Sequence, residues 1–433
     1  SLSRPEKVGI VGMAWYAPRT FVSQAALEKA DGCEGKYTVG LGQRSMAFCD
    51  DREDVGSLLL TVTKKLFERY GVDPSKVGRL EVGTETLVDK SKSIKTSLVD
   101  ELGLSRDCEG VTSVNACYGG TAALLNSVAW VESRAWDGRV AVVVCGDIAV
   151  YEKGPARPSG GAGAFAALIA PNAPLVLEPI RATCALDVWD FYKPYHSEYA
   201  AVDGKLSQAA YLRSVDECWR RFKDKDEATS LSDFAYCCFH APYNKLVQKG
   251  FARLFRDDVE PFSGPGDYEA SLADKAYDAA LRKASKDLYL QKVAPTTTIP
   301  THTGNAYTAS LYLGLASLFV KGEGKNEEKT EVKQGDRILL FSYGSGSMAT
   351  MFSLKVDADP AALSAALSFS SAALTDRMEC SVEAFTAALE LREARYGQSD
   401  YTPTGSPVPL APGTYSLASV DDKFRRTYAR LPL

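Results

Sequence analysis

The same order of apolar runs occurs in both halves of the sequence, and this repeat limits the possible folds more than any other feature. The run at 142–144 continues through a glycine-rich stretch into a second run at 164–169. In the later half, the run at 338–341 leads through the segment SYGSG into a run at 351–356. Short β-branched runs that alternate with longer helical patterns favour an α/β fold. Two halves that each end in paired strands indicate an internal duplication.

Hydrophobic periodicity predicts several individual elements. Strands are expected at 8–11, 80–82 and 140–145, and helices at 57–69 and 122–131. Three polar or proline-rich segments interrupt the pattern, and they are expected to form a surface helix with its loop, a solvated hairpin or loop, and a C-terminal crossover, at 257–287, 322–335 and 402–413 respectively. None of these segments is long enough to link independent domains.

Composition excludes several classes of protein. The chain has 433 residues, of which 45% are hydrophobic, so it can bury a substantial core. Its formal net charge of −5, without long blocks of like charge, argues against a nucleic-acid partner. The longest apolar runs fall far short of the roughly 18 residues that a membrane-spanning helix needs, so we expect a soluble protein without a membrane partner. Residues 1–5 carry no signal-peptide core, but a start without Met leaves a removed targeting segment open.

The cysteines and histidines show no metal-binding pattern. The ten cysteines include no Cys-x-x-Cys pair and no regular spacing, which is typical of free thiols in a reducing compartment. The three histidines do not have metal-ligand spacing, so we expect no metal site. These observations favour a cytoplasmic protein.

Cys117 is a candidate nucleophile. Gly119 and Gly120 follow it closely, and an apolar helical run begins after them. The free N–H groups and the positive dipole end of a helix N-terminus favour a thiolate, so the pKa of this thiol is expected below its usual value of roughly 8.5. The glycines allow close backbone approach to a substrate, and nearby N–H groups could stabilise an oxyanion. The alternative is a buried, inert cysteine.

Two other clusters offer acid–base groups and cations. Glu85 lies in the segment EVGTET, where a strand ends in a loop, and a partly apolar site would raise its pKa toward neutrality. His240 lies between aromatic neighbours, and Lys245 and Lys249 follow it one helical turn apart, where they could meet phosphates. A capping acid, a structural histidine and a solvated lysine pair are the alternatives.

These clusters belong to a longer ordered series of motifs. The series comprises EVGTET (81–86), NACYGGTAA (115–123), GDIAVY (146–151), DFYKP (190–194), FHAPY (239–243), GNAYT (304–308), SYGSG (342–346) and RRTYAR (425–430). It resembles the eukaryotic type of hydroxymethylglutaryl-CoA synthase over nearly the whole chain. The resemblance implies the thiolase fold, five layers in the order αβαβα built from two similar halves, here 1–178 and 179–433 with insertions near 257–287 and 322–335. It also implies a homodimer.

The resemblance assigns a role to each catalytic candidate. Cys117 would accept the acetyl group of acetyl-CoA, Glu85 would act as general acid and base, and His240 would engage acetoacetyl-CoA. The product would be hydroxymethylglutaryl-CoA, in the mevalonate pathway of isoprenoid and sterol synthesis. The two CoA thioesters are substrates, and no cofactor is implied.

Further site residues follow from the same resemblance. Those that would contact CoA or the acyl group are Ser159, Ser207, Lys245, Lys249, Asn305, Tyr307, Ser342 and Tyr343. Those that would support the site are Tyr118, Asp147, Asp190, Phe191 and Gly344. The chain departs from the family pattern at three places, since Pro155 replaces a frequent asparagine, Ser159 a frequent threonine, and the segment RATCA at 181–185 a segment that usually contains Gly-Thr-His-Met.

Four other functions remain open at this point. A β-branching relative would act on acyl-carrier-protein substrates rather than on free acetoacetyl-CoA. A thiolase or ketosynthase would share the fold and the cysteine, but the GTET cluster around Glu85 argues against these enzymes. A non-catalytic acyl-CoA-binding protein would not need Cys117, Glu85 and His240 together. A cysteine hydrolase would release CoA from acetyl-CoA alone.

Overall fold

The computed structural model describes residues 5–194, 196–227, 229–259, 267–321 and 331–433. Nine strands form one mixed sheet in the order β11-β13-β14-β8-β1-β7-β6-β4-β5. Their bounds are β1 (Gly9–Tyr16), β4 (Val77–Gly83), β5 (Thr112–Ser113), β6 (Val140–Ala149), β7 (Gly161–Ala170), β8 (Leu175–Ala185), β11 (Tyr236–Phe239), β13 (Arg337–Gly344) and β14 (Met348–Val356). The expected strands at 80–82 and 140–145 lie inside β4 and β6, and the one at 8–11 falls on the start of β1.

Strand pairing confirms the internal duplication. In one half, β4 is parallel to β6, and β6, β7 and β1 are successively antiparallel. In the other half, β11 is parallel to β13, and β13, β14 and β8 are successively antiparallel. The two sets meet where β1 pairs with β8, at Gly9 opposite Val176 and Ile10 opposite Leu175.

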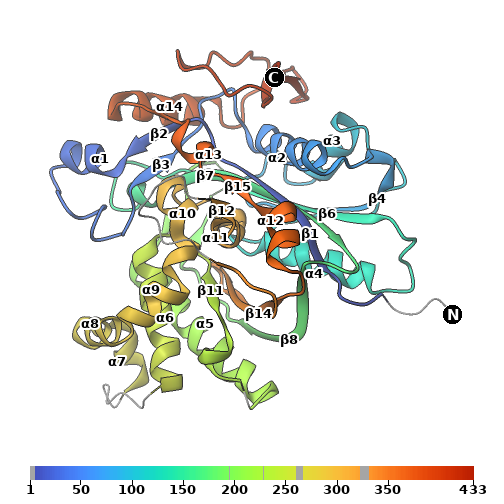
Figure 1. Ribbon diagram of the computed structural model, residues 1–433. Helices are drawn as coiled ribbons and strands as arrows, with labels where there is room; N and C mark the ends of the chain where they lie inside the picture. The colour runs from blue at the N-terminus through green and yellow to red at the C-terminus, as the bar shows by residue number, and fades with distance from the viewer. Residues whose placement is uncertain (1–4, 195, 228, 260–266, 322–330) are drawn as a thin grey trace.

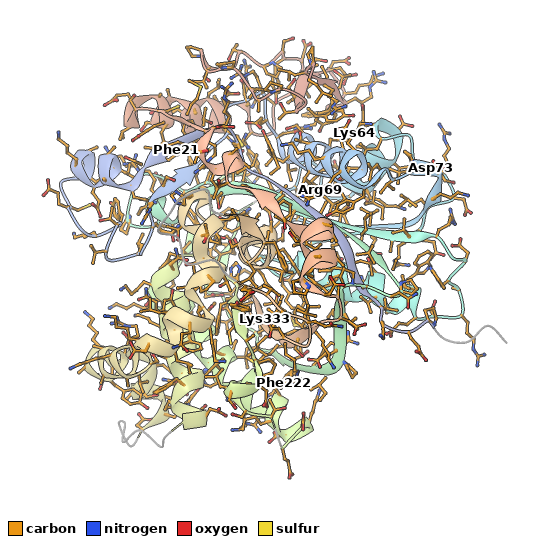
Figure 2. All side chains as sticks on the ribbon, in the orientation of Figure 1. Phe21, Lys64, Arg69, Asp73, Phe222 and Lys333 are labelled. Carbon is orange, nitrogen blue, oxygen red and sulfur yellow. The ribbon has the colours of Figure 1, made fainter. Side chains whose placement is uncertain are left out.

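Helices complete five layers in the predicted order αβαβα (Figure 1). The middle layer holds α4 (Gly119–Val131) and α11 (Ser310–Ser317), which are apolar enough to be buried between the two halves of the sheet. One outer layer contains α2 (Val55–Tyr70), packed on β1, β6 and β7. The other contains α5 (Gly204–Lys225) and α6 (Asn244–Val259). In Figure 2, Lys64 on α2 and Phe222 on α5 mark these opposite outer layers.

Shorter elements surround these layers. The helices are α1 (Gln24–Asp31), α3 (Ile94–Glu101), α7 (Tyr268–Ala273), α8 (Lys275–Ala284), α9 (Lys286–Lys292), α10 (Thr298–Thr303), α12 (Pro360–Leu367), α13 (Ala372–Thr375) and α14 (Val382–Arg395). The small sheets are β16-β2-β3 (Met378–Glu379, Thr20–Ser23, Ser45–Ala47), β9-β10 (Phe191–Tyr192, Ala201–Val202), β12-β15 (Val320–Lys321, Phe369–Ser370) and β17-β18 (Tyr415–Val420, Arg426–Arg430). Within the described residues, no helix is both long and apolar enough to cross a bilayer.

The segment expected as one surface helix contains more than one. Its described part holds the end of α6, all of α7 and α8, and the start of α9, because Asp267 and Asp274 each cap a new helix with a side-chain oxygen. Residues 260–266 of this segment, and 322–330 of the expected polar loop, lie outside the described residues.

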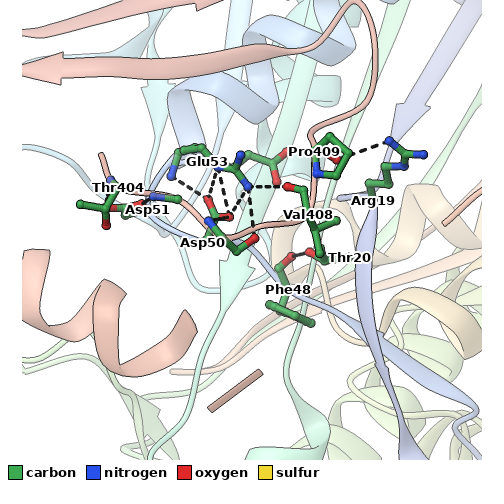
Figure 3. Close-up of polar contacts among 12 residues, drawn as sticks. Arg19, Thr20, Phe48, Asp50, Asp51, Glu53, Thr404, Val408 and Pro409 are labelled. Carbon is green, nitrogen blue, oxygen red and sulfur yellow. Dashed lines mark hydrogen bonds and ion pairs between the residues drawn. The ribbon is translucent and has the colours of Figure 1, made fainter. Parts of the chain in front are cut away.

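The proline-rich segment 402–413 crosses onto the first half of the chain. The Asp51 carboxylate accepts hydrogen bonds from the Thr404 N–H at 2.9 Å and from its hydroxyl at 3.3 Å. The Arg52 guanidinium donates to the Val408 carbonyl oxygen at 2.7 Å (Figure 3). The chain then enters the hairpin of β17 and β18, which packs on α2.

Candidate active site

Each of the three catalytic candidates comes just after a strand or just before a helix. Glu85 comes two residues after β4, Cys117 two residues before α4, and His240 directly after β11. The main chain of β13 lies in close contact with the loop that carries Cys117. A Cβ atom on Gly344, at the end of β13, would lie 1.9 Å from the Ala116 carbonyl oxygen, so only glycine allows β13 to approach the Cys117 loop this closely.

Cys117 has an unusual backbone and apolar surroundings. Its φ of +56° lies in the left-handed region, which costs a non-glycine residue free energy and is often found at functional sites. The side chain contacts a cluster that includes Tyr151, Phe191 and Tyr307. The cysteine therefore lies in a strained turn among aromatic rings, which fits a nucleophile better than an inert core thiol.

Glu85 contacts Cys117 directly. Its Oε2 accepts a hydrogen bond from the Cys117 N–H at 2.5 Å, and its Oε1 lies 3.4 Å from Lys193 Nζ. Burial raises the pKa of the Glu85 carboxyl, the Lys193 ammonium opposes this rise, and the Asp147 carboxylate adds to it. The direction matches the prediction for a group that transfers protons near neutral pH.

The predicted effect on Cys117 is wrong in this structure. Burial, followed by the negative charges of Glu85 and Asp147, raises the pKa of the Cys117 thiol well above its usual value. A helix dipole contributes only about 0.3–1 kcal/mol at a terminus, whereas burial can shift a pKa by several units. The thiol is therefore protonated and needs a base before it can attack.

The N–H groups near Cys117 are also already bonded. The Cys117 N–H donates to Glu85, the Tyr118 N–H to the Ala116 oxygen at 2.7 Å, and the Gly119 N–H to the Asn115 oxygen at 3.1 Å. In this state the N–H groups of Cys117, Tyr118 and Gly119 are therefore not free to bind a thioester oxygen. Glu85 competes with any substrate oxygen for the Cys117 N–H.

Asp147 fixes the Glu85 loop. Its Oδ1 accepts hydrogen bonds from the Thr84 hydroxyl at 2.7 Å, the Glu85 N–H at 2.8 Å, and the Thr86 N–H and hydroxyl at 2.9 and 2.8 Å. Its Oδ2 accepts from the Thr308 N–H at 2.9 Å and from the Thr308 hydroxyl. Asp147 is fully buried, so this single carboxylate ties the loop after β4 to the second half of the chain.

His240 is buried and uncharged. Its side chain is 1% exposed, and burial lowers the pKa of the imidazole to about 3. The main chain is fixed by the His240 N–H, which donates to Phe341, and by the Tyr211 hydroxyl, which donates to the His240 oxygen at 2.9 Å. The ring atom Nδ1 has no partner among the described residues. A neutral imidazole can still donate one hydrogen bond to a developing oxyanion.

Asp190 and Phe191 connect β13 to the aromatic cluster. The Asp190 carboxylate accepts hydrogen bonds from the Tyr343 hydroxyl at 3.2 Å and the Gly346 N–H at 3.0 Å. The Phe191 ring packs edge-on against Tyr307, with centroids 5.6 Å apart. Both residues contact side chains or main chain near Cys117, and their supporting role stays a prediction.

Several expected substrate contacts are occupied by internal hydrogen bonds. Asn305 Oδ1 accepts from the Tyr307 N–H at 2.8 Å, which holds Tyr307 at a positive φ of 43°. Ser342 Oγ accepts from the Thr121 hydroxyl at 2.7 Å. Tyr118 pairs its hydroxyl with that of Thr350 at 2.7 Å. In this state these three side chains hold neighbouring residues of the site in place.

The expected CoA-binding residues fall into two groups. Lys245 and Lys249 lie one turn apart on α6, and Lys249 Nζ donates at 3.2 Å to Gln208 on α5, the residue after Ser207. Burial and the neighbouring Arg282 lower the pKa of Lys245. Ser159 comes from a short 3-10 helix (Arg157–Ser159), and its hydroxyl donates to Ala156 at 2.7 Å.

Among the described residues, no three His, Cys, Asp or Glu side chains gather as a metal site would require. All ten cysteines are in this described part, and all are free.

The sequence analysis missed a charged residue that touches the site. Lys193 lies in the DFYKP motif, but only the structure shows that it pairs with Glu85. A cation inside a motif shared with a known family was the available signal.

A strained cysteine in direct contact with a buried carboxylate, in a duplicated αβαβα fold, defines an acyl-transferring enzyme of the thiolase type. Comparison with known proteins identifies the family. The models "Hydroxymethylglutaryl-coenzyme A synthase N terminal" and "C terminal" match residues 4–174 and 175–431. The chain belongs to the hydroxymethylglutaryl-CoA synthase family.

Individual relatives agree with this assignment. The hydroxymethylglutaryl-CoA synthase erg13A of Aspergillus fumigatus is 46% identical over 99% of this chain and 97% of its own length. The cytoplasmic hydroxymethylglutaryl-CoA synthase of Homo sapiens is 45% identical over 99% of this chain and 88% of its own. Among solved structures, MvaS in complex with 3-hydroxy-3-methylglutaryl coenzyme A is 32% identical with a TM-score of 0.82, covering 99% of this chain and all of that one.

Proposed function

We propose that this protein condenses acetyl-CoA with acetoacetyl-CoA and water to form 3-hydroxy-3-methylglutaryl-CoA and CoA, in the mevalonate pathway. The observation that supports the chemistry is the direct contact between the Glu85 carboxylate and Cys117 in a buried site. Family membership supports the choice of substrates.

The first half of the reaction acetylates Cys117. The thiol loses its proton to Glu85 as the sulfur attacks the acetyl carbonyl carbon, and the same proton leaves on the sulfur of the departing CoA. The products are acetyl-Cys117, free CoA and an ionised Glu85. The raised pKa of the Glu85 carboxyl helps this transfer, because a more basic carboxylate accepts a proton more readily, and the raised pKa of the thiol makes such a base necessary.

The second half forms the carbon–carbon bond. Glu85 removes a proton from the methyl group of acetyl-Cys117, and the resulting enolate carbon attacks the ketone carbon of acetoacetyl-CoA. His240 donates a hydrogen bond to the ketone oxygen as negative charge develops there, and Glu85 returns its proton to that oxygen. Water then hydrolyses the thioester to Cys117, which frees the product and restores the thiol.

The remaining site residues would position CoA and the acyl groups. Lys245 and Lys249 carry positive charges suited to phosphates, and Ser159 and Ser207 carry hydroxyl groups suited to the rest of the coenzyme. The aromatic cluster around Tyr307 would exclude water from the acetyl group. We also propose that the enzyme is a cytoplasmic homodimer.

Two variants test the catalytic assignment. Cys117→Ala should abolish acetylation by acetyl-CoA, as measured by the mass of the intact protein. Glu85→Ala should still acetylate, but more slowly, because the thiol loses its base even though removal of the negative charge lowers its pKa. It should hardly condense. Condensation by Glu85→Ala at a near wild-type rate would contradict the acid–base role.

CoA release then separates this function from its rivals. With acetyl-CoA alone, the wild-type enzyme should release CoA slowly, and addition of free acetoacetyl-CoA should accelerate release strongly. Full release with acetyl-CoA alone would indicate a hydrolase. A requirement for an acyl-carrier-protein substrate would indicate a β-branching enzyme.

A further inference from the structure

Lys193 is a cation inside the site to which the reaction described above gives no role. Its Nζ lies 3.4 Å from Glu85 Oε1 and donates to the Glu85 main-chain oxygen at 3.4 Å. The same ammonium lies 4.8 Å from the centroid of the Tyr307 ring. The Lys193 side chain is 24% exposed, whereas that of Glu85 is 5% exposed. Lys193 therefore reaches from a partly solvated position to a buried carboxylate.

The charges around Glu85 are unbalanced without this lysine. The Cys117 N–H bonds to the Glu85 carboxylate, Asp147 on β6 accepts the Glu85 N–H, and the rings of Tyr151 and Tyr307 pack together beside Cys117. Asp147 adds negative charge, and burial disfavours ionisation of Glu85. A carboxylate that must remove a methyl proton has to be ionised first.

We propose that Lys193 is a positioning residue that keeps Glu85 ionised and directed at Cys117 before each proton abstraction. The proposal rests on the acid–base role of Glu85 in the proposed function. Lys193 holds both the carboxylate and the main chain of the same residue, so it controls charge and orientation together. The contact with the Tyr307 ring fixes the ammonium in place without neutralising it.

The size of the effect follows from the geometry. An opposite charge within about 4–6 Å typically lowers a carboxyl pKa by about 1–3 units. Lys193 is partly exposed, so solvent screening places the expected effect at the lower end, about one unit. Lys193→Met should therefore shift the acidic limb of the pH–rate profile for condensation to a pH about one unit higher.

The test compares four variants by the pH dependence of kcat/KM for condensation. Lys193→Met and the polar, neutral Lys193→Gln should both show the upward shift, and Lys193→Arg should restore the wild-type limb. Lys223→Met is a matched control, since Lys223 pairs with the buried Asp258 at 3.2 Å and lies over the Trp219 ring at 5.8 Å, on the outer helix α5. The acidic limb of the pH profile of Lys223→Met should stay where it is in the wild type.

A second readout needs no turnover and separates this proposal from the proposed function. The carboxyl stretch of Glu85, assigned by its loss in Glu85→Gln, can be titrated by infrared spectroscopy without CoA thioesters. The wild-type protein could fail to condense while the Glu85 titration in Lys193→Met still shifts by about one pH unit. That pair of results would refute the proposed function and support the role of Lys193. Unchanged titration of Glu85 in both Lys193→Met and Lys193→Gln would overturn the role of Lys193, whatever the activity.

Discussion

The Asp147 carboxylate provides the sharpest test of how the site is built. It accepts hydrogen bonds from six donor groups on Thr84, Glu85, Thr86 and Thr308. Asp147→Asn keeps the shape of the side chain but replaces one oxygen with an NH2 group, which cannot accept. The least costly orientation leaves Oδ1 facing the four donors near Glu85 and turns the NH2 group toward Thr308.

The cost of this substitution can be counted. Two hydrogen bonds from Thr308 to a charged acceptor are lost, but the Thr308 hydroxyl can still donate to the Gly83 oxygen at 3.0 Å. One buried N–H is then left without a partner and the other bonds weaken, because their acceptor is no longer charged. At about 1.5–3 kcal/mol for a bond to a charged group, we expect a loss of about 2–4 kcal/mol in unfolding free energy.

Urea unfolding followed by tryptophan fluorescence measures this loss. The exposed Asp73→Asn is the control, because Asp73 also accepts two hydrogen bonds, both from Ser75, but in solvent, and it should change stability by less than about 1 kcal/mol. Asp147→Asn also removes a negative charge that raises the pKa of Glu85, so the acidic limb of condensation should move downward. A stability loss below about 1 kcal/mol together with an unmoved limb would refute the reasoning.

Two further predictions concern His240 and Gly344. His240 stays neutral in the folded protein down to about pH 3, whereas it becomes protonated near pH 6.5 in the unfolded chain. The free energy of unfolding should therefore fall as the pH drops below 6.5, by up to about 1.4 kcal/mol per pH unit from this group. His240→Phe should reduce that slope in acid unfolding curves, and an equal slope would contradict the buried neutral imidazole. Gly344→Ala places a Cβ 1.9 Å from the Ala116 oxygen, so the Cys117 loop must shift, and acetylation followed by mass spectrometry should slow by about 10²-fold. Unaltered acetylation would show that the loop position is not critical.

The fold could be predicted from the sequence because its main signals are local. Apolar runs and glycine-rich turns in the two halves are visible along the chain, and they specify the matching sets β6-β7 and β13-β14. Boundaries were less accurate. Helix α4 begins at Gly119, before the expected start at 122, because glycines are poor helix formers and hide the true N-terminus.

The site chemistry was only partly predictable, because it depends on distant neighbours. The cysteine and the carboxylate are evident in their motifs, but the pKa of Cys117 is set by burial and by Glu85 and Asp147. A helix-start argument considers only local backbone, so it predicts the opposite direction. Lys193 and the hydrogen bonds of Asp147 likewise require the tertiary arrangement.

The attachment of the segment 402–413 determines when the first half can finish folding. Asp50 and Asp51 are each 5% exposed, and their main-chain donors at 404–406 follow them by more than 350 residues. During synthesis, the carboxylates of Asp50 and Asp51 have no hydrogen-bond donors, and the outer face of α2 has no β17 to pack against, until those later residues have been made. The half made first therefore stays incomplete until residues 404–406 and β17 have been made, so its final closure comes late.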